Sequence, residues 1–141
     1  MKAAKICAVA LCAVVLILIL AALPKKLCFD GETCEKYTFF CGNTSSDCRE
    51  VDGGANAGLK RLFLSDVCGE SAVYKDFDLE RFLQKVNGKI LFEERVAGTV
   101  NYYLSADLPY TVNINGYSVN AHVCVREKDV KVGSPIIFGG Y

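Results

Sequence analysis

The sequence predicts an α+β protein: an antiparallel sheet of hairpins with two helices packed on one face, preceded by one N-terminal transmembrane helix. Three observations lead to this fold class. An apolar run occupies the N-terminus, a segment in the middle of the chain has the apolar spacing of a helix, and the second half contains β-rich segments joined by short turns. Because strands and helices do not alternate as βαβ units, we expect antiparallel strands with helices on their apolar face.

The apolar run Ile6–Leu23 contains eighteen residues without a charge, eleven of which are Leu, Ile or Val. As a helix it is about 27 Å long, close to the ~30 Å hydrocarbon core of a bilayer. Its Leu, Ile and Val side chains favour insertion by about 3–7 kcal/mol. Residues 1–23 are therefore predicted to be a single-pass membrane anchor, with the short N-terminal end cytoplasmic and the bulk of the chain extracytoplasmic.

A secretory signal peptide is the alternative reading of this run, because Lys2 and Lys5 form a positive N-terminal region. The apolar core of a signal peptide is usually about 7–15 residues, which is shorter than this run. The cleavage site is also poor, since Leu20 stands two residues before Ala22 and Pro24 follows closely. We therefore expect an uncleaved anchor, with a secreted protein released by cleavage as the alternative.

Pro24 ends the helix, and residues 24–35 are predicted to form a short stalk before one domain at 36–141. The first elements of that domain are the strands Lys36–Cys41 and Cys48–Val51, joined by the polar turn Gly42–Asp47. Apolar residues in Asn56–Val67 then fall near helical spacing, with Gly69 as a stop.

The second helix has the clearest signal in the domain. Asp78 is a good N-cap, and Asn87-Gly88 tolerates the left-handed geometry that ends a helix. Between them an apolar stripe has the i, i+3, i+4, i+7 spacing of one helix face; it comprises Leu79, Phe82, Leu83 and Val86.

The remaining strands are predicted downstream. They are Lys89–Val96 and Thr99–Ala106 joined at Ala97-Gly98, then Tyr110–Ile114 and Tyr117–Arg126, then Val130–Val132. Asn115-Gly116 indicates a two-residue type I′ turn. This turn would pair Ile114 with Tyr117 and Val112 with Val119. Period-two alternation then predicts that His122 and Cys124 lie on the polar face of the sheet.

Charge and motifs exclude several functional classes. Lys+Arg and Asp+Glu both number 16, so the net charge is zero and no concentrated basic surface favours nucleic acid. No glycine-rich phosphate loop, dinucleotide fingerprint or nucleophile-elbow motif occurs. We therefore expect no cofactor, no metal and no assigned catalytic residue.

Cysteine is the most conspicuous residue type, with eight in 141 residues. No CxxC spacing occurs, which argues against thioredoxin-like redox chemistry and zinc ribbons. An even number outside the anchor suits disulfides in an oxidising exterior, and Cys41 with Cys48 is the best pair because it would close the Gly42–Asp47 turn. In a reducing environment the same thiols would stay reduced.

His122, the only histidine, precedes Cys124 by two residues and would share its face of the strand. A Cys–His pair is the chemistry of a nucleophile and its base, so these residues, together with Cys68, are the candidates for a thiol site. The spacing alone is weak, and an ordinary hydrogen-bonded histidine is the expectation.

The C-terminal segment Tyr110–Tyr141 resembles the end of YwmB-like proteins of Gram-positive spore-formers. The residues that carry the match are Gly116, Val119, Asn120, Gly133, Ser134, Pro135, Ile136, Ile137 and Tyr141. The resemblance covers roughly a quarter of the chain. It implies a secreted or membrane-attached protein with a TATA-box-binding-protein-like α+β fold, and it transfers no catalytic residue. The fold name does not imply DNA binding.

These observations favour a membrane-anchored domain that binds an envelope or cell-surface component, such as a surface protein, without catalysis. The alternative is a thiol-based enzyme that uses an exposed cysteine.

Overall fold

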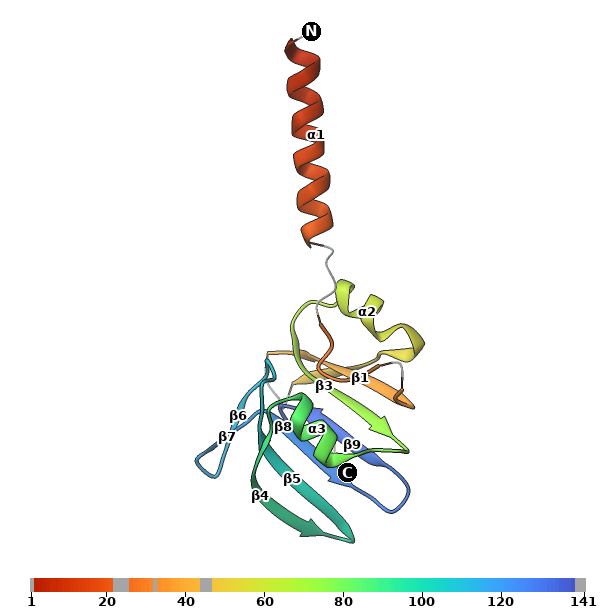
Figure 1. The fold of residues 1–141 in the computed structure, drawn as a ribbon, viewed down its shortest axis with the longest axis vertical. Coiled ribbons are helices and arrows are strands. Elements are labelled where there is room, and N and C mark those ends of the chain that lie inside the picture. Colours follow the sequence, from red (N-terminus) through yellow and green to blue (C-terminus); the bar gives the residue numbers. More distant parts are fainter. Residues whose placement is uncertain (1, 22–25, 32, 44–46, 139–141) are drawn as a thin grey trace.

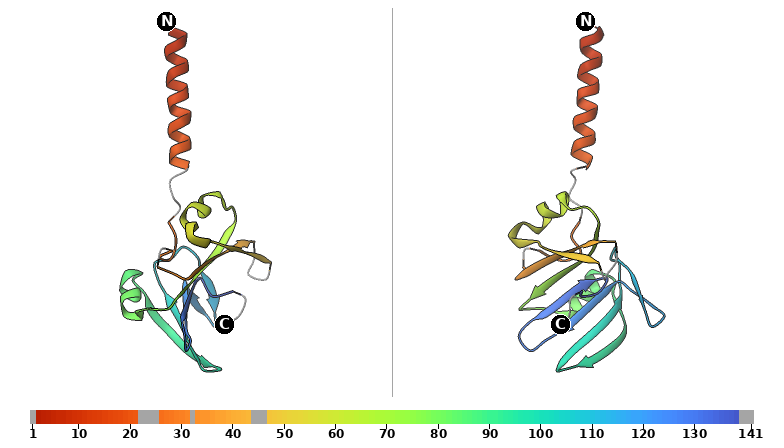
Figure 2. Two further views of the ribbon diagram at one scale, coloured as in Figure 1. Left: turned by 90° about the vertical axis from the view of Figure 1, so that its right-hand side faces the viewer. Right: turned by 180° about the vertical axis from the view of Figure 1, so that it is seen from behind.

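A computed structural model describes residues 2–21, 26–31, 33–43 and 47–138. Helix α1 (Lys2–Ala21) stands apart from a β-rich body formed by the described residues from 26 onward (Figure 1). Figure 2 shows the same separation from the side and from behind. Within the described residues, no helix combines the length and apolar character that crossing a membrane requires.

One seven-stranded sheet forms the body, and every neighbouring pair of its strands is antiparallel. The strand order is β2-β1-β3-β9-β8-β5-β4. The bounds of these strands are β1 Lys36–Gly42, β2 Cys48–Asp52, β3 Val67–Tyr74, β4 Lys89–Val96, β5 Thr99–Ser105, β8 Ala121–Val125 and β9 Val130–Ser134. A separate two-stranded hairpin contains β6 (Val112–Ile114) and β7 (Tyr117–Val119). The predicted α+β class with an antiparallel sheet is confirmed.

The strand β3 is absent from the sequence-based expectation, which placed a helix at Asn56–Val67 with a stop at Gly69. The structure has a short 3-10 turn (Gly54–Asn56) and then α2 (Ala57–Phe63), and the chain enters β3 at Val67. Gly69 and Glu70 are poor strand formers, so their local preference argues against a strand. Pairing with β1 on one side and β9 on the other overrides that preference.

Helix α3 (Leu79–Lys85) covers one face of the sheet as predicted. The Asp78 carboxylate accepts a hydrogen bond from the Arg81 backbone N–H at 3.0 Å, which caps the helix. Asn87 has a φ of +48°, and the Gly88 N–H donates to the Leu83 carbonyl at 2.7 Å, which closes the C-terminus. The apolar stripe packs on the main core, whose buried members include Tyr37, Phe39, Ala72, Leu104, Val123 and Val132. Helix α2 contributes Ala57 to the same core.

The β6–β7 hairpin has the predicted register, with Ile114 opposite Tyr117 and Val112 opposite Val119. The φ angles of Asn115 and Gly116 are +52° and +84°, as a type I′ turn requires. The single strand predicted at Tyr117–Arg126 is wrong, because the chain leaves that ladder at Asn120. The Asn120 amide accepts from the Ala106 N–H at 3.3 Å and donates to Thr111 Oγ1 at 2.7 Å, so it bonds to neighbouring loops.

The second face of the sheet carries a smaller core, which corrects the expectation that His122 and Cys124 lie on a polar face. Their relative exposures are 1% and 0%. The C-terminal segment folds back over this face, where the Phe138 ring meets Phe40 edge to face at 4.8 Å and Ile137 is buried. Sequence alternation separated the two faces correctly, but it could not reveal that a later segment covers the second one.

Gly133 in β9 lies where this returning segment touches the sheet. A Cβ at this position would be 2.7 Å from the Ile136 carbonyl oxygen and 2.8 Å from the Ile137 backbone nitrogen. Because backbone atoms cannot rotate aside, Gly133→Ala should lower the free energy of unfolding by about 1–3 kcal/mol. Gly58→Ala in α2 is the matched control, since nothing lies within 4 Å of its Cβ position. That change should leave stability equal or raise it by up to ~1 kcal/mol in denaturant titrations. Equal effects of the two substitutions would contradict this packing.

Candidate functional site

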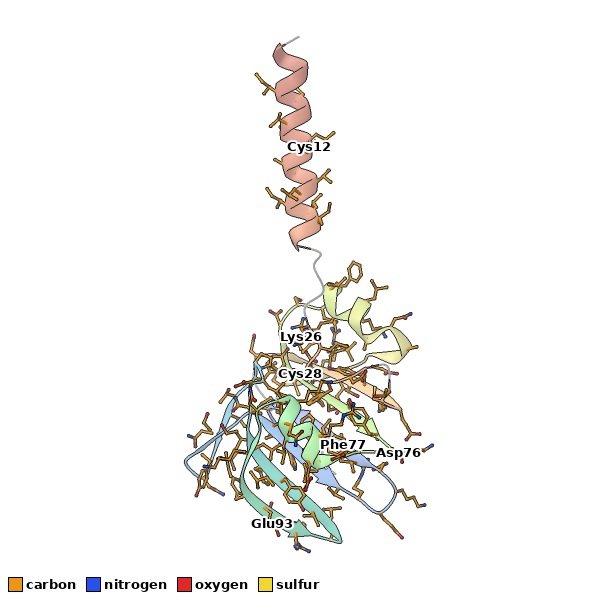
Figure 3. The ribbon with its side chains drawn as sticks, viewed as in Figure 1. Cys12, Lys26, Cys28, Asp76, Phe77 and Glu93 are labelled. Carbon is orange, nitrogen blue, oxygen red and sulfur yellow. The ribbon has the colours of Figure 1, made fainter. Side chains whose placement is uncertain are left out.

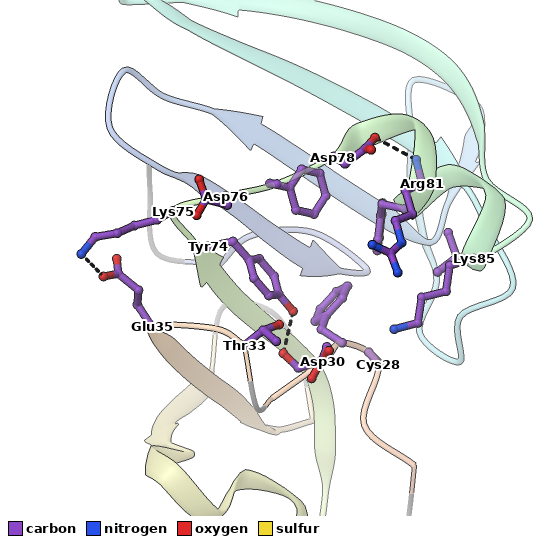
Figure 4. Close-up of a pocket in the computed structure, with 14 residues that line it drawn as sticks. Cys28, Asp30, Thr33, Glu35, Tyr74, Lys75, Asp76, Asp78, Arg81 and Lys85 are labelled. Carbon is purple, nitrogen blue, oxygen red and sulfur yellow. Dashed lines mark hydrogen bonds and ion pairs between the residues drawn. The ribbon is translucent and has the colours of Figure 1, made fainter.

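A groove of about 1290 Å³ lies between helix α3 and the segment before β1, and it is here called the α3 groove (Figure 4). One wall is the chain segment before β1, and the other is α3 with the turn that precedes it. Residues 30 and 35, which belong to the predicted stalk, are held against the body. The Tyr74 hydroxyl donates to the Asp30 carbonyl at 2.8 Å, and the Glu35 N–H donates to the Val73 carbonyl at 2.8 Å.

The floor of the α3 groove is aromatic. Phe77 lies 5.7 Å from Tyr74 and 5.3 Å from Phe82, measured between ring centroids, and Phe82 lies 6.1 Å from Phe29. Phe29 and Tyr74 are buried in the main core, whereas Phe77 and Phe82 are partly exposed. The partly exposed rings offer apolar surface that a ligand can cover.

The rim of the α3 groove is charged. Lys75 and Glu35 form an ion pair at 2.6 Å across one end. At the other end Arg81 and Lys85 stand one turn apart on α3 and extend over the opening towards the segment that holds Cys28 (Figure 4). Both are exposed, and the ion pairs among the described residues include neither of them. Two cationic groups are therefore available at this end for an acidic group of a ligand.

A buried polar network fixes the wall of the groove that contains Cys28. The Glu70 side chain is 1% exposed, and its Oε2 accepts hydrogen bonds from the Cys28 N–H at 2.9 Å and from the Tyr37 hydroxyl. Its Oε1 lies 3.3 Å from Arg61 Nε and 3.2 Å from the Tyr110 hydroxyl. Burial, followed by the charge of Glu70, raises the pKa of the Tyr37 and Tyr110 hydroxyls, so both stay protonated as donors.

Sequence reasoning missed this network, which joins five segments of the chain through one carboxylate. Arg61 also donates to the Tyr110 hydroxyl at 3.2 Å, and the Phe29 N–H donates to the Tyr37 hydroxyl at 3.4 Å. The one signal in the sequence was an acidic residue inside a segment that ends in Ala-Val-Tyr. The burial of this acidic residue can be predicted only if the segment is known to be a central strand.

The thiol candidates are placed in surroundings that disfavour a thiolate. Burial raises the pKa of Cys124 and of Cys68. The Cys68 thiol donates to the Phe40 carbonyl at 3.3 Å. His122 Nε2 lies 3.0 Å from Asn101 Oδ1, and its Nδ1 accepts from the Ile137 N–H at 3.4 Å. These contacts orient the imidazole towards β5 and the C-terminal segment.

Cys41 and Cys48 lie near the ends of β1 and β2, where Gly42 pairs with Cys48 and Cys41 pairs with Arg49. In this register Cys48 stands one residue away from the partner of Cys41, so alternation directs the two side chains to opposite faces of the sheet. The loop predicted at Gly42–Asp47 includes residues 44–46, which lie outside the described ranges. Among the described residues the structure contains no disulfide, and the Cys41–Cys48 pairing stays a prediction. Within the same residues no group of three or more metal-ligating side chains is arranged to hold a metal ion.

The α3 groove therefore combines an apolar floor, a cationic end and a wall fixed by a buried carboxylate. Comparisons with models of known protein families, with curated proteins and with solved structures find no significant match for this chain.

Proposed function

We propose that this protein is a single-pass, membrane-anchored binding module that holds a segment of another envelope or cell-surface protein in its α3 groove, without catalysis. The observation that carries the proposal is the groove itself, which has partly exposed aromatic rings on its floor and two cationic side chains at one end. Its volume exceeds the ~300–1000 Å³ of a typical small-molecule pocket, and it is open to solvent. These dimensions favour an extended segment of a protein over a small metabolite.

The anchor is supported by the apolar side chains of α1. The described Ile, Leu and Val side chains between Ile6 and Ile19 are 46–71% exposed and point to all sides of the helix (Figure 3). A helix that is apolar all round requires a non-aqueous environment. The apolar run continues to residue 23, beyond the described part of α1. Removal of this segment by signal cleavage would instead release the body as a secreted protein.

The chemistry of the groove defines the ligand segment that we propose. An aliphatic or aromatic side chain would cover Phe77 and Phe82 on the floor, and an acidic side chain would reach Arg81 and Lys85. Asp30, Asp76 and Asp78 on the rim would disfavour further acidic groups. We favour binding over thiol catalysis because burial raises the pKa of the two candidate thiols, Cys68 and Cys124.

A photo-crosslinking side chain at Thr33, which is exposed and lines the groove, tests this proposal in intact cells. We expect one envelope or surface protein to be captured from this position and not from Lys128 in the β8–β9 turn. Adding Arg81→Glu should lower the crosslinking yield about tenfold, because one side of an interfacial charge pair is reversed. Lys128→Glu is the matched control and should leave the yield unchanged. Equal capture at Thr33 and Lys128 would refute groove binding, and so would an unchanged crosslinking yield in the Arg81→Glu variant.

A further inference from the structure

Helix α2 presents two large apolar side chains to solvent on one face. Leu59 is 58% exposed and Phe63 is 81% exposed, and their i, i+4 spacing places them side by side. They border a shallow depression whose lining includes Gly53, Ala55 and Lys60. The opposite side of α2 is attached to the body through buried Ala57 and through Arg61 in the Glu70 network. The exposed pair therefore contributes little to the folding of the body.

The start of α2 lies next to the chain that leaves α1. A Cβ at Gly31 would be 3.6 Å from the Ala57 Cβ and 3.1 Å from Leu27, so the segment that contains Leu27 and Gly31 lies next to the first residue of α2. From residue 23 to residue 27 the chain reaches about 14 Å at full extension. Helix α2 itself adds about 10 Å. The step from Leu27 past Gly31 to Ala57 adds roughly 10 Å more, so if the apolar run ends at the membrane surface, Phe63 lies within roughly 35 Å of that surface in any orientation of the body.

The views of the molecule show which element of the body faces α1. In Figure 1 and in both views of Figure 2, α2 is the element of the body that lies nearest to the end of α1. Figure 3 places Lys26 at the same end of the body. Lys26 and Lys60 are exposed, so cationic groups accompany the apolar pair, as is usual where a helix meets lipid head groups.

We infer that Leu59 and Phe63 form a second membrane contact, in which α2 rests in the interface of the bilayer that holds the anchor. This inference rests on the anchor in the proposed function. Two residues are too few for a stable protein interface, which buries about 800 Å² on each partner. They suffice for a contact between α2 and the lipid head-group region, because the anchor already holds the helix at the membrane. Attachment at two points limits rotation of the body about the anchor and sets the direction in which the α3 groove faces.

The chain contains no tryptophan, so a single introduced tryptophan is an unambiguous reporter. In the full-length chain reconstituted into phosphatidylcholine–phosphatidylglycerol vesicles, Phe63→Trp should show blue-shifted emission. Lipids brominated near the glycerol should quench most of that emission. Val96→Trp is the control, because Val96 is 44% exposed and ends β4 at the opposite end of the body. Its emission should not respond to brominated lipid.

The possible results separate the two proposals. Vesicle flotation reports the anchor, and quenching reports the α2 contact. If the chain floats with the vesicles while both Phe63→Trp and Leu59→Trp emit as in water, the second contact is refuted and the anchor stands. If the chain does not float, both the anchor and the α2 contact are overturned. Equal quenching of Phe63→Trp and Val96→Trp would also overturn the inference, because the body would then lack a preferred face.

Discussion

Replacing Glu70 with alanine is expected to lower the free energy of unfolding by about 3–5 kcal/mol, the largest effect of a single substitution that we predict. The change would leave Arg61 as a largely buried cation without its carboxylate, and the Tyr37 and Tyr110 hydroxyls without an acceptor. Small domains have a total stability of about 5–15 kcal/mol, so the variant would lose a large part of it. Denaturant unfolding of the full-length chain followed by circular dichroism measures the difference.

Two controls separate the loss of charge from the loss of hydrogen bonds. Glu70→Gln keeps the shape and one acceptor oxygen, and it should cost less than Glu70→Ala. Glu127→Ala in the exposed β8–β9 turn removes the same type of side chain and should change stability by less than ~0.5 kcal/mol. A Glu70→Ala variant as stable as Glu127→Ala would show that the network does not hold the segments together. Because Glu70 fixes the backbone at Cys28, Glu70→Gln should also weaken groove crosslinking from Thr33.

Acidification from pH 6.5 to pH 4 is expected to remove about 3 kcal/mol of stability through His122 alone. Burial, with a smaller contribution from the nearby cation of Lys131, lowers the pKa of His122 to about 4 from its ordinary value of 6.5. The unfolded chain therefore binds a proton on His122 in this pH range, whereas the folded chain does not. The contribution of the neutral imidazole is complete above pH 6.5 and decreases as the pH falls towards 4.

The same pH range also titrates carboxylates, so the test compares two proteins. The side chain in His122→Gln does not titrate and can still donate to Asn101, although the variant should be less stable than the wild type at pH 7. Its stability should fall less between pH 6.5 and pH 4, by a difference of up to about 3 kcal/mol. Parallel stability–pH curves for the two proteins would contradict a neutral, buried His122.

Local patterns in the sequence determined helix α3 and the β6–β7 register correctly. The cap at Asp78, the stripe from Leu79 and the Asn115-Gly116 turn depend on interactions between residues that are close in the sequence. A short stretch of sequence is therefore enough to predict them. The strands β1, β2, β4, β5 and β9 were also predicted, each to within two residues, because their β-branched and aromatic content agrees with their final environment.

Tertiary structure alone decided the role of β3, the burial of His122 and the position of the α3 groove. In β3, Glu70 satisfies donors from segments up to 42 residues away in sequence, and no local pattern encodes such partners. His122 becomes buried because residues 135–138 return over it, and the groove exists because residues 28–30, 33 and 35 lie beside α3. Each feature requires contacts that form only when distant segments meet. Bringing these segments together costs loop-closure entropy, and burial of the whole core offsets that cost.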